Sequence, residues 1–432
     1  GYNVSLNSPA PSNPDELLIF NGSLTLTGSG ALSLRSMTIG RDLSKNARLV
    51  MNGSGVSFGY NGSSSTDEFV LGSAGTAESK PDNGGCEPLE LGAAKLVLDQ
   101  GTEWILDGSN FTGSFPIGYR FVLANFGSFS GSIAVLRTRN FNMPANRRLE
   151  LVATSSSIYY EVISQTAAIG PNIILINVDD MAGGQHFGFE GRNCLTPALD
   201  TLSSTGIRFT LAMAASTVCG PSRYSLLTSR WPSRNTSSNF ANLYPLGALG
   251  RFGVSDTDLE HDGQNIGAWL KQAGYRTGFV GKSHVLDDDL KNTAAWGAKG
   301  LLTYGKTVDP ATNAAVNGAM QHNHRVVCQM MREHGFDYVD GFYHANLKEL
   351  YSDKLNVHNQ EWVTSRALRF IDENHDSRFF LYMAPTINHG PVNNNLDYTL
   401  RANKSYTSAG YLPNEDYSFM PTRQAIINQV NA

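Results

Sequence analysis

Short alternating runs of apolar and polar residues, separated by glycine, asparagine and serine, fill the first part of the chain. Apolar residues two positions apart, such as Leu24 and Leu26, are typical of strands with one buried face. Residues 48–53 and 95–101 echo one another, which indicates a repeated unit. This pattern predicts an all-β domain over residues 1–165, either a parallel β-helix (a solenoid) or a β-sandwich.

A different pattern begins near residue 170. Residues 173–178 are apolar except for Asn177, as expected of a strand buried on both faces. Helix and strand patterns then alternate, with helices expected at 197–204, 266–274 and 363–371 and strands at 275–280 and 379–383. This alternation predicts an α/β domain over residues 170–432, built on a mostly parallel sheet with helices on both faces.

The composition narrows the classes of function. The chain has 432 residues, of which 41% are hydrophobic and 16% charged, with a net charge of -5. The length predicts two or three folded domains, and without a basic run we expect no nucleic-acid partner. No apolar stretch is long enough for a transmembrane segment. The polar start of the chain and its glycine- and serine-rich first part favour a secreted or cell-surface protein whose signal peptide has been removed, over a cytosolic one.

Two clusters of residues carry candidate chemistry. Asp179 and Asp180 directly follow the first strand of the α/β part, and the carboxyl ends of strands are where ligands bind in such sheets. Adjacent carboxylates repel one another unless a cation lies between them, so a hard divalent metal is the natural partner; the alternative is an acidic turn. Cys219 lies 40 residues downstream of Asp179, followed by Pro221 and Arg223.

The four cysteines are scattered along the chain, at positions 86, 194, 219 and 328. They lack CxxC spacing, so a zinc site is not expected. If Cys219 is chemically modified, the other three can form at most one disulfide, and Cys194 and Cys328 are expected to be buried or paired.

Residues 219–230, Cys-Gly-Pro-Ser-Arg-Tyr-Ser-Leu-Leu-Thr-Ser-Arg, resemble the signature of the type I sulfatases of the alkaline-phosphatase superfamily. The likeness continues in chain order outside this signature. It covers residues 171–180, 196–200, 273–284, 335–341 and 379–391. The third of these stretches ends in Gly-Lys-Ser-His.

This resemblance implies a mechanism and a cofactor. Cys219 would be converted to formylglycine by a maturation enzyme, and its hydrate would attack sulfur to give a covalent sulfate ester. Arg223 would hold the hydrate with a permanent positive charge. Asp179 and Asp180 would bind Ca²⁺, which polarises the sulfate oxygens.

The resemblance also implies roles for three residues farther along the chain. Lys282 would contact a sulfate oxygen, His284 would hydrogen-bond the formylglycine, and His389 would protonate the leaving alcohol. Four nearby residues are candidates for lining a substrate pocket, although a structural role is more common for such positions. These are His322, His324, His344 and Lys348.

The chain departs from the sulfatase pattern at several points. Ser229 stands in place of the usual glycine and Ser283 in place of the usual aromatic residue. Sulfatases place an Asp-Asn or Asp-His pair and a second lysine after the position of His389. Among later residues, Asp397, Glu415 and Asp416 lie in loop-like sequence. We therefore expect residues 170–432 to be the N-terminal portion of a catalytic domain, completed by a C-terminal fragment.

The sequence thus predicts a sulfuric ester hydrolase that acts on a sulfated polysaccharide or another sulfate ester. An alternative is a structural or adhesive surface protein that forms filaments and lacks activity. A phosphate-ester or phosphonate hydrolase of the same superfamily is less favoured, because those enzymes use threonine or serine as nucleophile and usually zinc.

Overall fold

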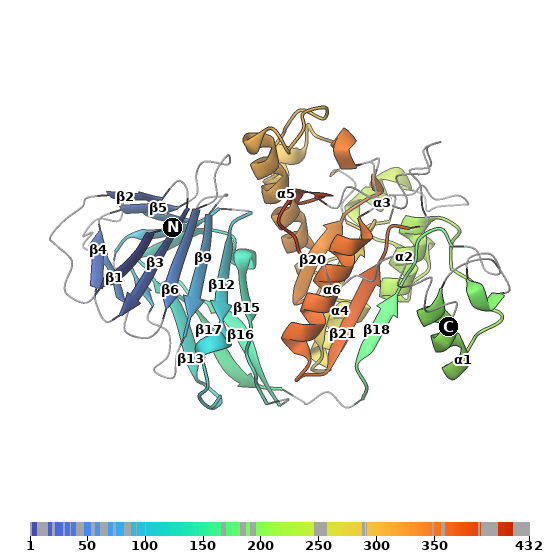
Figure 1. The fold of residues 1–432 in the computed structure, drawn as a ribbon, viewed down its shortest axis with the longest axis horizontal. Coiled ribbons are helices and arrows are strands. Elements are labelled where there is room, and N and C mark those ends of the chain that lie inside the picture. Colours follow the sequence, from blue (N-terminus) through green and yellow to red (C-terminus); the bar gives the residue numbers. More distant parts are fainter. Residues whose placement is uncertain are drawn as a thin grey trace.

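The computed structural model describes the strands of residues 2–60 by their backbone and most of residues 68–417 in full (Figure 1). Outside the described residues lie the loops between the first strands and the segments 61–67, 72–74, 82–87, 92, 100, 145, 166–169, 182–186, 191–195, 246–256, 287–289, 291, 348–349, 356–358, 388, 390–404 and 418–432. Cys86, Cys194, Lys348 and Asp397 therefore lie outside the described residues.

The described part of residues 2–164 consists of strands and two short 3-10 helices, and its strands form three sheets. The first sheet contains β1 (Tyr2–Leu6), β3 (Gly22–Gly28), β6 (Ala47–Asn52), β9 (Gly75–Lys80), β12 (Glu103–Asp107) and β15 (Leu136–Arg139). The second contains β2 (Glu16–Ile19), β5 (Ser36–Ile39), β8 (Glu68–Leu71), β11 (Lys95–Leu98) and β14 (Ser128–Gly131). The third contains β4 (Ala31–Leu34), β7 (Ser57–Tyr60), β10 (Leu89–Glu90), β13 (Arg120–Asn125), β17 (Ser157–Ser164) and β16 (Arg147–Ala153).

Neighbouring strands in these sheets are parallel, except that β17 pairs antiparallel with both β13 and β16. Gly22 pairs with Ala47, and Ala47 pairs with Gly75, so the chain returns to the same sheet after 25 and then 28 residues. The echo of residues 48–53 in 95–101 is not this repeat, since β6 and β11 lie in different sheets. The two echoing segments are also farther apart in the sequence than the 25 to 28 residues after which the chain returns to the same sheet.

Stacked side chains on β9, β12 and β15 show how successive turns are joined. The Arg139 guanidinium bridges the buried carboxylates of Glu78 and Asp107, at 2.6 and 2.9 Å. Trp104 donates a hydrogen bond from its indole nitrogen to Ser79, one strand away, at 3.0 Å. The apolar interior beside them consists of side chains from all three sheets, including Phe69, Leu71, Leu89, Leu96, Leu98, Leu106, Phe121, Leu123, Leu136, Ile158 and Val162.

The α/β part is built on a parallel sheet in the order β18 (Ile173–Ile176), β21 (Phe379–Ala384), β19 (Arg276–Lys282) and β20 (Tyr338–Tyr343). Its helices are α1 (Pro197–Thr205), α2 (Cys219–Thr228), α3 (Ser238–Leu243), α4 (Ile266–Gln272), α5 (Ala314–Arg332) and α6 (Gln360–Asn374). A small antiparallel pair, β22 (Tyr406–Thr407) and β23 (Gly410–Tyr411), lies beside α5. The helices and strands predicted from the sequence are present within a few residues of their expected bounds.

Alternate residues of the central strands face two separate cores. Phe279 and Phe380 pack with side chains of α2, α4 and α5 on one face. Val280 and Leu381, their chain neighbours, pack with Trp362 and other side chains of α6 on the opposite face. Helices thus cover both faces of the sheet, as the alternation of helix and strand patterns predicted.

The prediction that residues 173–178 are buried on both faces is wrong. Among the described strands, β18 is at the edge of the sheet and pairs with β21. Ile173 and Leu175 pack against the core that contains α2 and α4, whereas Ile174 and Ile176 are 49% and 51% exposed. Helix α6 covers β19, β20 and β21, so on the described residues its cover stops before β18.

Helix α5 joins the two parts of the chain, and it lies between the strands of residues 2–164 and the α/β sheet in Figure 1. Arg325 donates to the carbonyl oxygen of Gly101, and Gln329 donates to the carbonyl oxygen of Thr102 at 3.2 Å. Gly101 has φ +78°, and a Cβ at this position would overlap the buried ring of His322. We call this contact between α5 and residues 101–102 the seam. It requires a glycine at position 101, both for the backbone angle and for the lack of a side chain.

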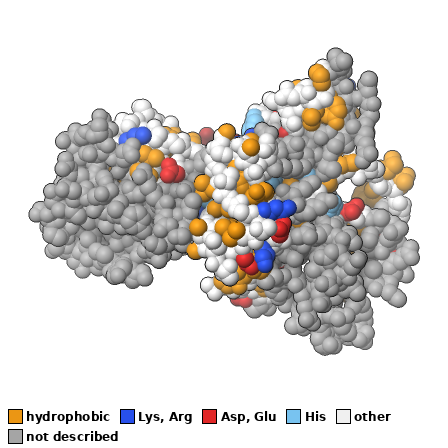
Figure 2. Space-filling model, turned by 90° about the horizontal axis from the view of Figure 1, so that it is seen from above, with side chains coloured by type: hydrophobic (Ala, Val, Ile, Leu, Met, Phe, Trp, Pro, Cys, Tyr) orange, Lys and Arg blue, Asp and Glu red, His pale blue; other side chains and the backbone are white. Residues whose placement is uncertain are grey.

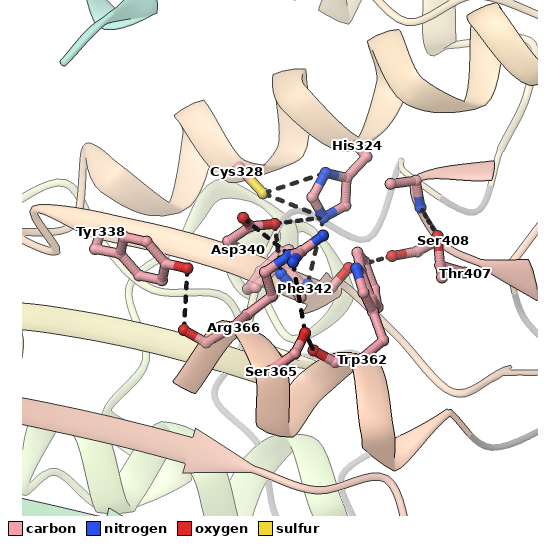
Figure 3. Close-up of polar contacts among 12 residues, drawn as sticks. His324, Cys328, Tyr338, Asp340, Phe342, Trp362, Ser365, Arg366, Thr407 and Ser408 are labelled. Atoms are coloured by element: carbon pink, nitrogen blue, oxygen red, sulfur yellow. Dashed lines mark hydrogen bonds and ion pairs between the residues drawn. The ribbon is translucent and has the colours of Figure 1, made fainter. Parts of the chain in front are cut away.

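A buried polar network connects α5, β20 and α6 (Figure 3). His324 accepts a hydrogen bond from the Phe342 amide at 3.3 Å and lies 4.0 Å from the Asp340 carboxylate. Arg366 pairs with Asp340 at 3.3 Å and with Glu415 at 2.5 Å, which also ties the chain after residue 405 to the sheet. Burial lowers the pKa of His324 to about 4, although the Asp340 charge opposes the shift. His324 is therefore a neutral imidazole of the core at pH 7.

The described surface carries mixed charges and some large apolar side chains. Positive and negative side chains lie interspersed on the face seen in Figure 2. Exposed apolar residues are concentrated on α1 and after it, and include Leu202, Ile207, Phe209, Leu211 and Met213. Among the described residues, no helix combines the length and apolar character needed to cross a membrane.

We expect Gly101→Ala to lower the free energy of unfolding by about 2–4 kcal/mol, because it adds left-handed strain and an overlap with His322. Gly118 is the matched control, since it has φ +85° with open space around its Cβ position. Gly118→Ala should cost about 1 kcal/mol, from backbone strain alone. Denaturant unfolding of both variants measures the difference, and equal losses would show that the His322 contact has no energetic importance.

The buried His324 predicts an acid-sensitive fold. Its pKa is lower in the folded protein than in the unfolded chain, so its contribution is complete above about pH 6.5 and is lost as the pH falls toward 4. The loss amounts to about 3 kcal/mol. His324→Gln keeps an acceptor for the Phe342 amide but does not titrate. Unfolding measured at pH 7 and pH 4 should show a smaller loss in this variant than in the wild type, and identical losses would contradict the prediction.

Candidate functional site

Residues that are far apart in the sequence meet at the carboxyl edge of the parallel sheet. Asp179 follows β18, Lys282 is the last residue of β19, and Cys219 is the first residue of α2. The backbone of β18 continues its pairing beyond the strand, since the Asp179 amide donates to the carbonyl of Ile387 at 3.2 Å. This arrangement follows from parallel strands, whose carboxyl ends lie at one edge.

Two cations and one carboxylate form the buried centre of this site. Lys282 Nζ lies 2.5 Å from Asp179 Oδ2, and Arg223 Nη2 lies 3.4 Å from Asp179 Oδ1. Arg223 also donates from Nη1 to the carbonyl oxygen of Lys282 at 2.5 Å. Burial acts to raise the pKa of Asp179, but the charges of Arg223 and Lys282 outweigh it and hold this pKa below its usual value. Asp179 is therefore ionised at neutral pH.

Cys219 and His284 face one another beside this centre. Cys219 Sγ lies 3.2 Å from His284 Nδ1, the thiol is not in a disulfide, and the Cys219 side chain is partly exposed. His284 is buried and has φ 56°, a left-handed conformation that is uncommon for a residue with a side chain. Its amide donates to the carbonyl of His344 at 3.0 Å, which holds the strained residue in place.

Asp180 and His389 occupy the outer part of the site. Asp180 is exposed and, like His284, has a positive φ, of 53°. Its side chain is therefore in solvent while that of its neighbour Asp179 is buried. His389 is partly buried, and its charge contributes to the lowered pKa of Asp179, so the imidazole lies near that carboxylate.

The described residues provide a partial ligand set for a metal. Ca²⁺ takes six to eight oxygen ligands. Asp179 and Asp180 provide hard carboxylate oxygens, which suit this ion, but no cluster of three or more acidic, histidine or cysteine side chains with metal-binding geometry occurs within the described ranges. Glu415, in the later part of the chain, instead pairs with Arg366. The oxygens of the two aspartates are of the type that Ca²⁺ prefers, while Asp179 is paired with Lys282 and Arg223 and Asp180 is exposed.

Asn346 is the site residue that sequence reasoning missed. Its side-chain oxygen accepts from Lys282 Nζ at 2.5 Å, and the residue is 5% exposed. Asn346 follows β20, just as Asp179 follows β18. No strand was predicted at residues 338–343, so no signal in the sequence singled out Asn346.

The pocket-lining candidates have different environments. His324 belongs to the buried network, and the His322 side chain is buried at the seam with Gly101, where its Nε2 lies 2.6 Å from the Gly300 carbonyl. His344 is next to the site through its backbone, which accepts from the His284 amide. Cys328 is buried as expected, as a free thiol 3.6 Å from His324. Burial raises the pKa of this thiol well above its usual value, so it is unreactive.

The two serines that replace usual sulfatase residues are both accommodated. Ser229 ends α2 in the left-handed conformation, with φ 59°, which is the position where a glycine would be without strain. Ser283 donates from its amide to the Tyr343 carbonyl at 2.9 Å, extending the pairing of β19 with β20. With both serines in place, Cys219 lies beside His284 and Lys282 lies beside Asp179.

The sequence is similar to a known protein family and to several known proteins. The family model described as Sulfatase matches residues 171–427. The chain is 34% identical to human steryl-sulfatase over 119 residues, covering 28% of this chain and 20% of that protein. It is 35% identical over 115 residues to an N-acetylgalactosamine-6-O-sulfatase of Bacteroides thetaiotaomicron, covering 27% and 20%. It is 32% identical over 236 residues to the N-acetylgalactosamine-6-sulfatase of Mus musculus, covering 51% and 40%.

The matched region contains Asp179, Cys219, Arg223, Lys282 and His284. In the first relatives that it matches, the chain spans about a fifth of their length. The family model itself covers more than half of the chain. On this match, the chain belongs to the sulfatase family, within the alkaline-phosphatase superfamily.

Proposed function

We propose that this protein hydrolyses sulfate esters at the site formed by Cys219, Arg223, Lys282, His284 and His389. The observation that carries the proposal is the position of Cys219 Sγ, 3.2 Å from His284, beside a buried centre in which two cations face one carboxylate. The surplus positive charge suits a sulfate group, and the site is reached through a partly exposed residue 219.

Residue 219, as formylglycine hydrate, would supply the oxygen nucleophile that a thiol does not. His284 is placed to hydrogen-bond the group at position 219, and the strained backbone of His284 fixes that contact. Arg223 and Lys282 would orient the sulfate oxygens and offset the negative charge that develops on them. His389 would donate its proton to the alcohol oxygen as the sulfur–oxygen bond breaks.

Ca²⁺ would add Lewis-acid polarisation of the sulfate oxygens when it is bound. Asp179 and Asp180 would be two of its ligands. Asp179 lies between Lys282 and Arg223, while Asp180 is exposed to solvent.

We also propose a sulfated polysaccharide as the substrate class, with the protein secreted or at the cell surface and formylglycine made by a maturation enzyme. Two of the relatives are named for N-acetylgalactosamine-6-sulfate. Residues 1–165 would be a separate parallel β-helix domain before the catalytic domain of residues 170–432, because strands return to the same sheet in parallel after each turn. A repetitive surface of this kind suits attachment to an extended glycan.

Cys219 is expected to be modified in the natural protein and essential for activity. Peptide mass spectrometry should find formylglycine at position 219, and Cys219→Ala should reduce kcat/KM for an aryl sulfate by about 10³-fold or more. Cys328→Ala is the matched control, because that thiol is buried in the core away from His284. It should lower stability and leave kcat/KM unchanged. Full activity of Cys219→Ala would exclude the proposed nucleophile.

Ca²⁺ should stabilise the folded protein through Asp179 and Asp180. At a free concentration of 100 times Kd, binding adds about 2.7 kcal/mol to the free energy of unfolding, which EDTA should remove. Asp180→Asn should weaken this Ca²⁺-dependent shift in Tm. Asp353→Asn, which removes an exposed carboxylate paired with Lys306, should leave it intact. An equal Ca²⁺ response in both variants would contradict the assignment of the ligand.

A further inference from the structure

The Lys282 ammonium is held by two acceptors of different charge. Its side chain is 1% exposed, and Nζ lies 2.5 Å from both Asp179 Oδ2 and Asn346 Oδ1. An ammonium group has three hydrogen-bond donors, and burial makes an unpaired donor costly. Two donors are thus directed by the protein, and no third protein acceptor for Nζ occurs among the described side chains.

Asn346 belongs to a segment that controls two functional residues at once. This segment follows β20, which pairs with β19 up to Lys282 and Tyr343. The His344 carbonyl accepts from the His284 amide at 3.0 Å and from the Ser283 hydroxyl at 3.3 Å. Two residues later, Asn346 contacts the Lys282 side chain. The position of Asn346 is therefore set by the same strand pairing that positions His284.

Because the Asn346 amide is uncharged, it does not change the net charge around Lys282. Arg223 and Lys282 face the single buried carboxylate of Asp179, so positive charge is in excess. A carboxylate at position 346 would orient the ammonium equally well but cancel that excess. An amide oxygen directs Lys282 and leaves its charge available to an anion.

We propose that Asn346 is a positioning residue, which aims the Lys282 ammonium at the sulfate group without neutralising it. This inference rests on the proposed sulfatase function and adds a specific part to it. Asn346 does not touch the reacting atoms; it acts through Lys282.

Titration calorimetry with inorganic sulfate tests this role on the full chain. We expect Asn346→Asp to raise the Kd for sulfate about tenfold or more, since it adds a charge that opposes the anion. Asn346→Ala should raise Kd by about threefold, because Lys282 loses one of its two acceptors. Asn323→Ala is the control: Asn323 is also a buried asparagine, bonded to the backbone of Leu302, and its loss should lower Tm without changing Kd.

A second measurement separates positioning from a general structural effect. In a Lys282→Met background, Asn346→Ala should cause no further rise in Kd, because the group that it directs is absent. The same factor in both backgrounds, or wild-type Kd values in both Asn346 variants, would overturn the inference while the sulfatase function stood. A wild-type protein that neither binds sulfate nor cleaves an aryl sulfate would overturn the proposed function itself.

Discussion

The buried contact between Lys282 and Asp179 is the interaction on which the site depends. A lysine ammonium that is 1% exposed is stable only with close acceptors, and Asp179 and Asn346 provide them at 2.5 Å. These three residues follow or end three different strands of one parallel sheet. The pairing of β18, β19, β20 and β21 must therefore be correct before Lys282 can reach its two acceptors, and these contacts in turn join the ends of β18, β19 and β20.

Backbone strain is concentrated at the same place. Four described residues other than glycine have a positive φ, and two of them, Asp180 and His284, belong to the predicted site. A third, Ser229, ends the helix that begins with Cys219. Such conformations persist where the surrounding structure holds them, as the His344 carbonyl holds the His284 amide. The strain fixes the direction of His284 toward Cys219, so the cost to stability is matched by a defined geometry around residue 219.

Helix α5 forms the contact between the two parts of the chain. Arg325 and Gln329 of α5 donate to the backbone carbonyls of residues 101 and 102, and the charge of Glu103 on β12 also acts on Arg325 and Arg332 of this helix. The seam also requires a glycine at position 101, beside His322. Residues that the sequence offered as pocket candidates, His322 and His324, are used to build this helix into the protein rather than to contact a ligand from solvent.

The sequence by itself determined the local structure and the chemical elements of the site. Apolar runs of consistent length set the strands of the α/β part, and helical spacing set its helices, because both depend on periodicity within a short segment. The order of Cys219, Pro221 and Arg223 also indicated the family that the comparison shows.

Only the tertiary structure decided what depends on contacts between distant residues. The edge position of β18 exposes Ile174 and Ile176, and the return of the chain after 25 to 28 residues differs from the echo in the sequence. The contact of Asn346 with Lys282 likewise depends on strand order, because β20 must lie beside β19 to bring the two side chains together.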